Sequence, residues 1–135
     1  MKLEKIKYSS LNAKQKEIYN FQKVASLLAD YGFNCIKLAD DWQGADFLAY
    51  NHKGNSTLKV QLKGRITIDK KYLDKDIFMS FPCGKEWYLI EHAVLIEIVK
   101  QNTPWLKSGS WINHGSYSAN LPSKKLLEAI KFSKL

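Results

Sequence analysis

Residues 56–65 show the pattern that most restricts how this chain can fold. In the sequence STLKVQLKGR, leucine and valine alternate with lysine and glutamine. Successive side chains of a β-strand point to opposite faces, so the alternation predicts a strand with one apolar and one polar face. The polar face carries Lys59, Gln61 and Lys63.

A second strand is predicted just before this one. Residues 45–50 are mostly apolar, and the intervening Asn51-His52-Lys53-Gly54-Asn55 contains the glycine expected in a hairpin connection. A third strand is expected at residues 33–38. The cluster at residues 40–44, Asp-Asp-Trp-Gln-Gly, is interpreted as a turn.

A helix is predicted over residues 12–31. Ile18, Phe21, Ala25 and Leu28 recur at helical spacing and form one apolar stripe. Asn12 or Ser10 is a candidate cap for its start, and Gly32 follows its end.

The rest of the chain predicts further strands and helices. Strands are expected at residues 77–82 and 86–90, a buried helix at 92–100, and a last helix capped by Ser123. Residues 108–121 are rich in Gly, Ser and Asn and predict an ordered loop, whereas residues 1–10 predict a loose arm or a short edge strand. The order of elements indicates an α+β fold, with a mixed sheet flanked by helices.

Charge indicates a polyanionic partner. The chain has 135 residues, enough for one domain, and its 21 Lys and Arg against 13 Asp and Glu give a net charge of +8. Nucleic acid is the first expectation and an acidic membrane surface the second, while the bland alternative is a lysine-rich soluble surface. The chain has neither an apolar run of membrane-spanning length nor the apolar core of a signal peptide, so we expect a cytoplasmic protein that does not enter the membrane.

Cysteine and histidine give no sign of a metal centre of their own. Cys35 and Cys83 lie far apart in apolar stretches and are interpreted as small buried hydrophobic residues. His52, His92 and His114 are scattered, and we expect each of them at the surface or in a turn.

The strongest chemical signal is Asp46 followed by Gln61 and Lys63. An antiparallel hairpin can place Asp46 beside the polar face that carries the other two side chains. Mg²⁺ prefers oxygen ligands and is often held by only one or two carboxylates, so Asp46, the Gln61 amide oxygen and the Leu62 carbonyl are candidate ligands. Such a cation neutralises the charge that grows on a phosphodiester during hydrolysis, and Lys63 is a candidate for orienting water or stabilising the transition state.

These segments resemble the PD-(D/E)XK nuclease superfamily. The resemblance is carried by Gly44-Ala45-Asp46-Phe47-Leu48-Ala49 and by Lys59-Val60-Gln61-Leu62-Lys63-Gly64-Arg65, and it spans about residues 12–90. It is strongest to the branch with group I intron homing endonucleases and Holliday junction resolvases. It implies a restriction-endonuclease-like fold: one domain over residues 1–135, with a core at about 12–100 and an aromatic C-terminal extension at 101–135.

The resemblance also implies an activity and a set of site residues. It implies a DNA endonuclease dependent on Mg²⁺ or Mn²⁺, with Asp46, Gln61 and Lys63 at the catalytic site and a polar residue of the first helix assisting them. Gln22 is the candidate for that helix position and Glu17 is second. Gln61 departs from the usual Asp or Glu, which removes a negative charge and predicts weaker binding of fewer than two cations. A homodimer is expected, because a duplex presents two strands related by a pseudo-twofold axis.

Basic and aromatic residues beyond the hairpin are candidates for contact with DNA. The predicted phosphate contacts are Arg65, Lys70, Lys71 and Lys75, with a solvated connection as the alternative. The aromatic residues Trp105, Trp111 and Tyr117 could stack on unpaired bases, although core packing is the commoner outcome.

Three alternative interpretations remain open at this point. The face with Lys59, Gln61 and Lys63 could be the solvated side of an edge strand. The domain could bind nucleic acid without cutting it, or it could be a small protein-interaction domain whose charge serves solubility.

Overall fold

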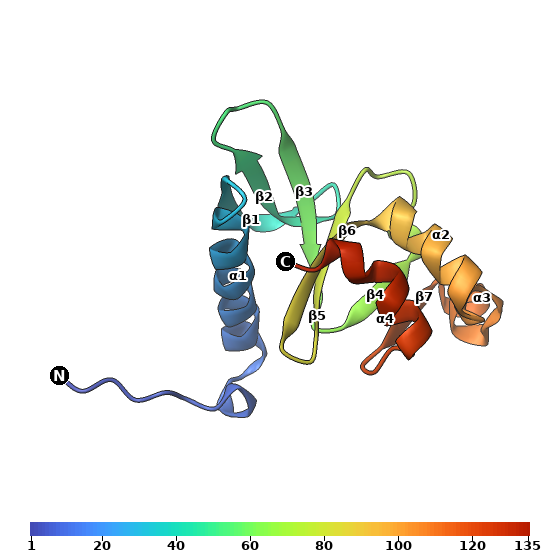
Figure 1. The fold of residues 1–135 in the computed structure, drawn as a ribbon, viewed down its shortest axis with the longest axis horizontal. Helices are drawn as coiled ribbons and strands as arrows, with labels where there is room; N and C mark the ends of the chain where they lie inside the picture. Colours follow the sequence, from blue (N-terminus) through green and yellow to red (C-terminus); the bar gives the residue numbers. More distant parts are fainter.

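The computed structural model describes residues 1–135, and its centre is a mixed five-stranded sheet (Figure 1). The strand order is β1-β2-β3-β5-β6, in which β3 and β5 run parallel and all other neighbours run antiparallel. The bounds are Phe33–Trp42 for β1, Ala45–Asn51 for β2, Thr57–Leu62 for β3, Phe78–Cys83 for β5 and Glu86–Glu91 for β6. The predicted α+β class with a mixed sheet flanked by helices is confirmed.

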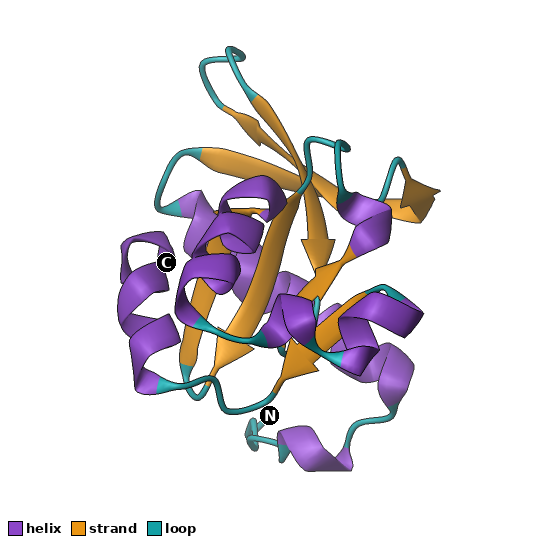
Figure 2. Ribbon diagram, turned by 90° about the vertical axis from the view of Figure 1, so that its right-hand side faces the viewer, coloured by secondary structure: helices purple, strands orange, loops and turns teal.

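Helices cover both faces of this sheet (Figures 1 and 2). Helix α1 (Ala13–Ala29) packs on one face. The other side carries a two-stranded antiparallel sheet, formed by β4 (Ile66–Asp69) and β7 (Ser116–Ala119), together with three further helices. Those helices are α2 (His92–Asn102), α3 (Gly109–His114) and α4 (Lys124–Ile130), and the short 3₁₀ turns are η1 (Tyr8–Ser10), η2 (Lys70–Tyr72), η3 (Trp105–Lys107) and η4 (Lys131–Ser133).

Helix α1 begins as the sequence predicts, but a different stripe of it is buried. The Asn12 side chain accepts the Gln15 N–H, and the Gln15 side chain accepts the Asn12 N–H, which satisfies two donors of the first turn. Val24 and Leu28 are fully buried, whereas Ile18 is 40% exposed. The predicted stripe therefore has the wrong register at its start, and this changes which polar residues of α1 face the sheet.

Two apolar cores lie on the two sides of the sheet. The smaller core joins Val24 and Leu28 of α1 to Phe47, Ala49 and Val60 of β2 and β3. The larger core joins the far face of the sheet to β4, α2 and α4. The hairpin strands thus contribute their apolar side chains to the α1 side, and the alternate polar side chains point the other way.

Several sequence predictions need correction. Strand β1 runs on to Trp42, so the predicted turn at residues 40–44 shrinks to Gln43 and Gly44, both with positive φ. The predicted loop at 108–121 contains α3 and β7, and residues 66–69 form β4 rather than a loose connection. Strand β7 is held by pairing with β4, which lies almost fifty residues away in the chain.

The C-terminal extension is part of the core and not an appendage. Trp105 is 7% exposed, and its ring stacks on that of Tyr117 at a centroid distance of 4.5 Å. Trp111 packs partly buried against the same core. The last residue, Leu135, donates its N–H to the Trp87 carbonyl of β6. Core packing is therefore the correct interpretation of these aromatic residues, rather than base stacking.

The N-terminal arm and the cysteines complete the fold. Residues 1–7 extend away from the domain (Figure 1). Cys35 and Cys83 are free thiols and are half-buried, so they are less enclosed than predicted. None of the helices combines the length and apolar character that crossing a bilayer requires.

Candidate catalytic site

The hairpin of β2 and β3 places Asp46 next to Gln61. Phe47 pairs with Val60 in the antiparallel register, and one step further along the register sets Asp46 opposite Gln61. Opposite residues of an antiparallel pair project to the same face. The Asp46 Oδ2 also accepts the Leu62 N–H at 2.8 Å, which fixes the carboxylate at the end of β3.

The Asp46 carboxylate is half-buried and only partly compensated. Burial raises the pKa of Asp46 above its ordinary value, and the nearby Asp41 charge acts in the same direction. The Leu62 N–H and the Lys63 charge oppose this shift of the pKa. Its second oxygen, Oδ1, has no hydrogen-bond partner in the protein. A cation bound at Oδ1 would therefore stabilise the ionised carboxylate, which the protein itself stabilises only in part.

Gln61 presents a buried oxygen without a partner. The residue is 7% exposed, and its Oε1 makes no hydrogen bond. Strand β3 lies between β2 and β5, so Gln61 does not lie on a solvated edge strand, and that alternative is wrong. Leaving a buried polar atom unpaired costs about 1–3 kcal/mol, so such an atom calls for an explanation.

Lys63 follows β3 and remains free of any carboxylate. The only ion pairs in the structure are Lys14–Glu17 and Lys131–Glu128. The Lys63 Nζ lies 5.8 Å from the centroid of the Tyr72 ring. Its backbone N–H is bonded to the Ser80 carbonyl at 2.8 Å, which ties the end of β3 to β5. The ammonium group is thus held near Asp46 and is available to a ligand.

Tyr72 also lies at the site, although it is not among the residues predicted from the sequence. Its hydroxyl is buried and has no hydrogen-bond partner. Burial raises the pKa of Tyr72, and the charges of Asp69, Asp46 and Asp41 raise it further, so the phenol stays protonated and can donate a hydrogen bond. No pattern in the sequence singles out Tyr72, which lies at the end of the short 3₁₀ turn η2.

Gly44 and Lys59 shape the surroundings of Tyr72. Gly44 has a φ of 88°, and a Cβ at that position would lie 3.3 Å from the Tyr72 ring, so the glycine leaves room for the ring. The Lys59 Nζ donates to the Lys75 carbonyl at 2.8 Å and to the Gln43 Oε1 at 3.2 Å. Lys59 therefore ties the segment after Tyr72 to the β1–β2 turn and has a structural role.

An acidic cavity of about 410 Å³ opens beside Asp46, between the start of α1 and β1. Glu17 of α1 lines it, together with Asp40 and Asp41 of β1. Two lysines, Lys14 and Lys37, also line it and offset part of this negative charge, unlike the cavity beside His92. Gln22 is exposed and does not line this cavity, because it lies five residues beyond Glu17, about 140° further around the helix. The structure therefore places Glu17 near Asp46 as the first-helix residue and leaves Gln22 outside.

The residues present fit a hard divalent cation with water ligands. No three acidic, histidine or cysteine side chains lie close enough together to hold a metal by themselves. The oxygen atoms available at the end of the hairpin are the free oxygen of Asp46 and the unpartnered Oε1 of Gln61. Mg²⁺ keeps several waters and uses few protein ligands, so this small oxygen set suits it.

The predicted DNA contacts fall into two environments. Lys71 lies over the Tyr72 ring at 5.1 Å and is therefore held beside the site, whereas Lys70 lies over the Trp111 ring of α3 at 5.4 Å. Arg65 is exposed between β3 and β4. Lys75, in contrast, lies between two aspartates that line an acidic cavity.

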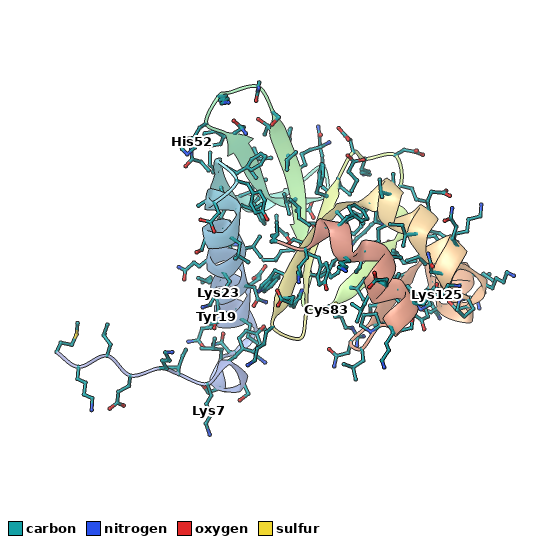
Figure 3. The ribbon with its side chains drawn as sticks, in the orientation of Figure 1. Lys7, Tyr19, Lys23, His52, Cys83 and Lys125 are labelled. Carbon is teal, nitrogen blue, oxygen red and sulfur yellow. The ribbon has the colours of Figure 1, made fainter.

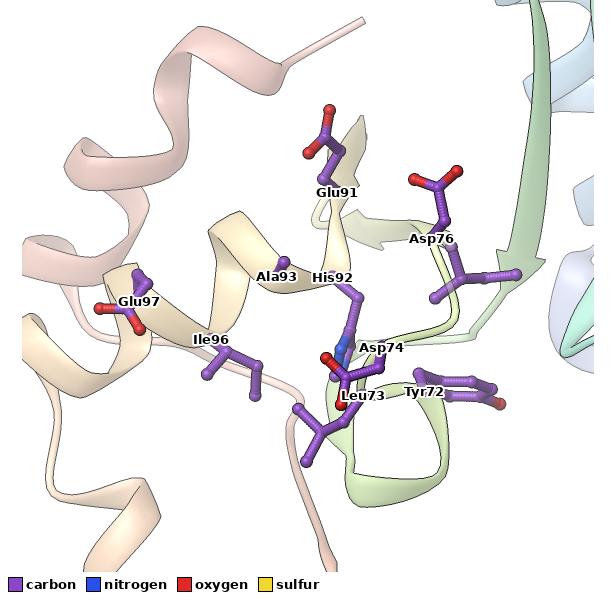
Figure 4. A pocket seen from close by; sticks show the side chains of 10 residues that line it. Tyr72, Leu73, Asp74, Asp76, Glu91, His92, Ala93, Ile96 and Glu97 are labelled. Atoms are coloured by element: carbon purple, nitrogen blue, oxygen red, sulfur yellow. The ribbon is translucent and has the colours of Figure 1, made fainter.

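That second cavity of about 240 Å³ adjoins Tyr72 (Figure 4). Its lining carries four carboxylates, from Asp74, Asp76, Glu91 and Glu97. Such a lining repels phosphate, so we expect this cavity to lie at the border of the DNA-binding surface and not within it.

His92 lines the same cavity and corrects an expectation. The sequence predicts this residue at the surface or in a turn, but it is 1% exposed at the start of α2. Its Nε2 accepts the Asp69 N–H at 3.2 Å, and its Nδ1 has no partner. Burial lowers the pKa of His92 to about 4. His92 is therefore neutral at physiological pH and packs edge-on against Tyr72.

Comparisons with known proteins find distant structural likenesses. No protein-family model and no curated protein matches the chain. Archaeoglobus fulgidus Hjc, a Holliday junction resolvase from an archaeal hyperthermophile, is similar with 13% identity and a TM-score of 0.47, over 58% of this chain and 75% of that chain. The bacterial homing endonuclease I-Ssp6803I is similar with 16% identity and a TM-score of 0.49, over 84% of this chain and 78% of that chain.

These two structures are of the two kinds that the sequence resemblance names. Because the identities and TM-scores are low, neither structure assigns an activity to this chain. The function is therefore drawn from the chain's own residues.

Proposed function

We propose that this protein is a metal-dependent DNA endonuclease whose site lies at the end of the β2–β3 hairpin. The observation that supports this most directly is the buried, unpartnered Oε1 of Gln61, which lies opposite the half-buried Asp46 carboxylate. A bound ligand that contacts this oxygen would explain why the folded protein leaves it without a hydrogen bond.

In this proposal, three oxygen atoms hold Mg²⁺ or Mn²⁺. They are the free carboxylate oxygen of Asp46, the Oε1 of Gln61 and the backbone carbonyl of Leu62. The bound cation would supply positive charge against the phosphate during in-line attack. The hydrogen bond from the Leu62 N–H orients Asp46 for this role.

The remaining residues position and stabilise the phosphodiester. The Lys63 ammonium group forms no ion pair with a carboxylate, so it can donate hydrogen bonds to a phosphate oxygen or to the attacking water. The protonated Tyr72 hydroxyl is a further donor on the same side of the sheet. Lys70, Lys71 and Arg65 extend the positive charge away from the site and contact neighbouring phosphates.

Plasmid nicking tests this proposal. We expect wild-type protein to convert supercoiled plasmid to the nicked form with Mg²⁺ or Mn²⁺ and not with EDTA. Asp46→Ala and Lys63→Ala should each lose at least 100-fold in rate, within the range that one catalytic donor contributes. Asp30→Ala and Lys53→Ala are matched controls, because both residues are exposed and lie outside the site.

The outcomes separate the enzyme from its alternatives. Nicking that persists in Asp46→Ala would contradict the proposed site. DNA binding without nicking in either metal would identify a binding domain that does not cut. If no salt-sensitive DNA binding occurs, the positive charge serves another purpose and an interaction domain is favoured.

A further inference from the structure

A third cavity differs from the two acidic ones in both charge and lining. It is a groove of about 380 Å³ between the N-terminal half of α1 and the β5–β6 turn. We call it the aromatic groove, and its lining residues are Tyr8, Tyr19, Asn20, Lys23, Gly64, Pro82, Gly84, Lys85 and Trp87. This lining contains no carboxylate, whereas each of the two other cavities described above has four.

The aromatic rings of the groove are arranged and held in place. Tyr8 and Tyr19 have ring centroids 5.2 Å apart, and the Asn20 side chain donates to the Tyr8 hydroxyl at 3.1 Å. Tyr8 is 41% exposed, so part of its ring surface is open to a ligand. Trp87 lies half-buried on the β6 side of the groove.

Lysines accompany these rings. The Lys23 Nζ lies 5.3 Å from the Tyr19 ring centroid, and the Lys16 Nζ lies 5.3 Å from that of Tyr8. Lys85 enters from the β5–β6 turn. Figure 3 labels Tyr19 and Lys23 on α1, together with Cys83, which ends β5 just before that turn. Rings with ammonium groups at their faces and no opposing acid form the combination that binds single-stranded nucleic acid.

The groove also adjoins the proposed catalytic site. Gly64 lines it and directly follows Lys63 in the chain. A strand that lies in the groove therefore reaches the end of β3, where Lys63 precedes Gly64. Bases of a duplex are already stacked on their neighbours, so only unpaired bases offer their faces to Tyr8 and Trp87.

We propose that the aromatic groove binds an unpaired stretch of DNA beside the phosphodiester bond that the site cleaves. The part of this inference that concerns cleavage rests on the proposed nuclease function. The binding of single-stranded DNA stands on the groove alone and is measured without a metal. The substrate class is therefore DNA with a single-stranded segment next to a duplex, such as a flap or an overhang.

Fluorescence anisotropy in EDTA tests the groove. The probes are a labelled oligothymidylate of about 12 nucleotides and a labelled hairpin duplex. Tyr8→Leu and Tyr19→Leu keep apolar bulk but remove the stacking surface, so each should weaken oligothymidylate binding at least fivefold, the lower end for one stacked base. Duplex affinity should change less than twofold. Tyr31→Leu is the matched control, because Tyr31 is 56% exposed and lies outside the groove.

A second pair of variants does not depend on the packing of the tyrosines. Lys23→Gln combined with Lys85→Gln should lower the slope of log affinity against log salt for oligothymidylate by about 1.4, because each phosphate contact contributes about 0.7. Lys53→Gln, in the β2–β3 turn, should leave that slope unchanged.

The results distinguish this proposal from the nuclease proposal. Unchanged oligothymidylate affinity in the tyrosine variants would overturn the proposal that the groove binds unpaired DNA. Equal losses of affinity for the duplex and for the single strand would overturn it as well. If the plasmid assay still shows nicking that needs Asp46, the nuclease proposal survives that result. Loss of single-strand binding in the tyrosine variants, with no nicking in any metal, would support the groove and contradict the nuclease.

Discussion

The substitution Gln61→Met should stabilise the metal-free protein while removing its response to divalent cations. Gln61 is 7% exposed and its Oε1 has no partner. Methionine is unbranched and fills a similar space, but it has no amide oxygen to leave unpaired. Replacing an unsatisfied buried group in this way should raise the free energy of unfolding by about 1–2 kcal/mol.

Urea unfolding in EDTA measures this gain. With a denaturant slope of about 2 kcal/mol per molar urea, the midpoint of Gln61→Met should lie about 0.5–1 M above that of wild type. Gln22→Met is the matched control, because Gln22 is exposed on α1. Its free energy of unfolding should change by less than about 0.5 kcal/mol.

Adding Mn²⁺ should reverse the order of the two proteins. At hundredfold excess over its dissociation constant, a ligand of the folded state adds about 2.7 kcal/mol, and this gain should appear in wild type and in Gln22→Met but not in Gln61→Met. The reasoning is refuted if Gln61→Met is less stable than wild type in EDTA. Equal stabilisation of Gln61→Met and wild type by Mn²⁺ would refute it as well.

Two further predictions concern acid stability and DNA contacts. Burial lowers the pKa of His92 to about 4 from 6.5, so the unfolded chain takes up the proton first as the pH falls. The free energy of unfolding should therefore drop by about 3 kcal/mol more in wild type than in His92→Gln between pH 7 and pH 4. Equal pH profiles in urea unfolding would contradict this. Replacing Lys70 and Lys71 with Ala should lower the salt slope of duplex binding by about 1.8 in anisotropy titrations, and an unchanged slope would remove both lysines from the interface.

The sequence predicts the parts of the fold that local patterns determine. The alternation at residues 56–65 correctly predicts β3 and its pairing with β2, although the strand ends at Leu62 and not at Arg65. Ser123 is correctly predicted to cap α4, where its Oγ accepts the Leu126 N–H. In contrast, β4 and β7 are short and pair across a long stretch of chain, so no local pattern indicates them.

The site was predictable in its centre and less so around it. Asp46 and Gln61 could be placed together because one hairpin holds both residues. To identify the residue of α1 that lies near Asp46, one must know which face of that helix is buried. The sequence leaves this open, because Ile18 and Val24 belong to two different apolar stripes of the helix. Tyr72 could not be placed, because the segment after β4 brings it back over Gly44.

Calorimetric titration with Mn²⁺ is the most direct test of whether Asp46 and Gln61 share one cation. We predict that wild type binds one ion per chain and that Asp46→Asn weakens its affinity at least tenfold. Gln61→Glu should tighten binding because it adds a charge beside the cation. Asp30→Asn, at the exposed end of α1, should behave like wild type. The same affinity in all four proteins, or no binding by wild type, would contradict the shared site.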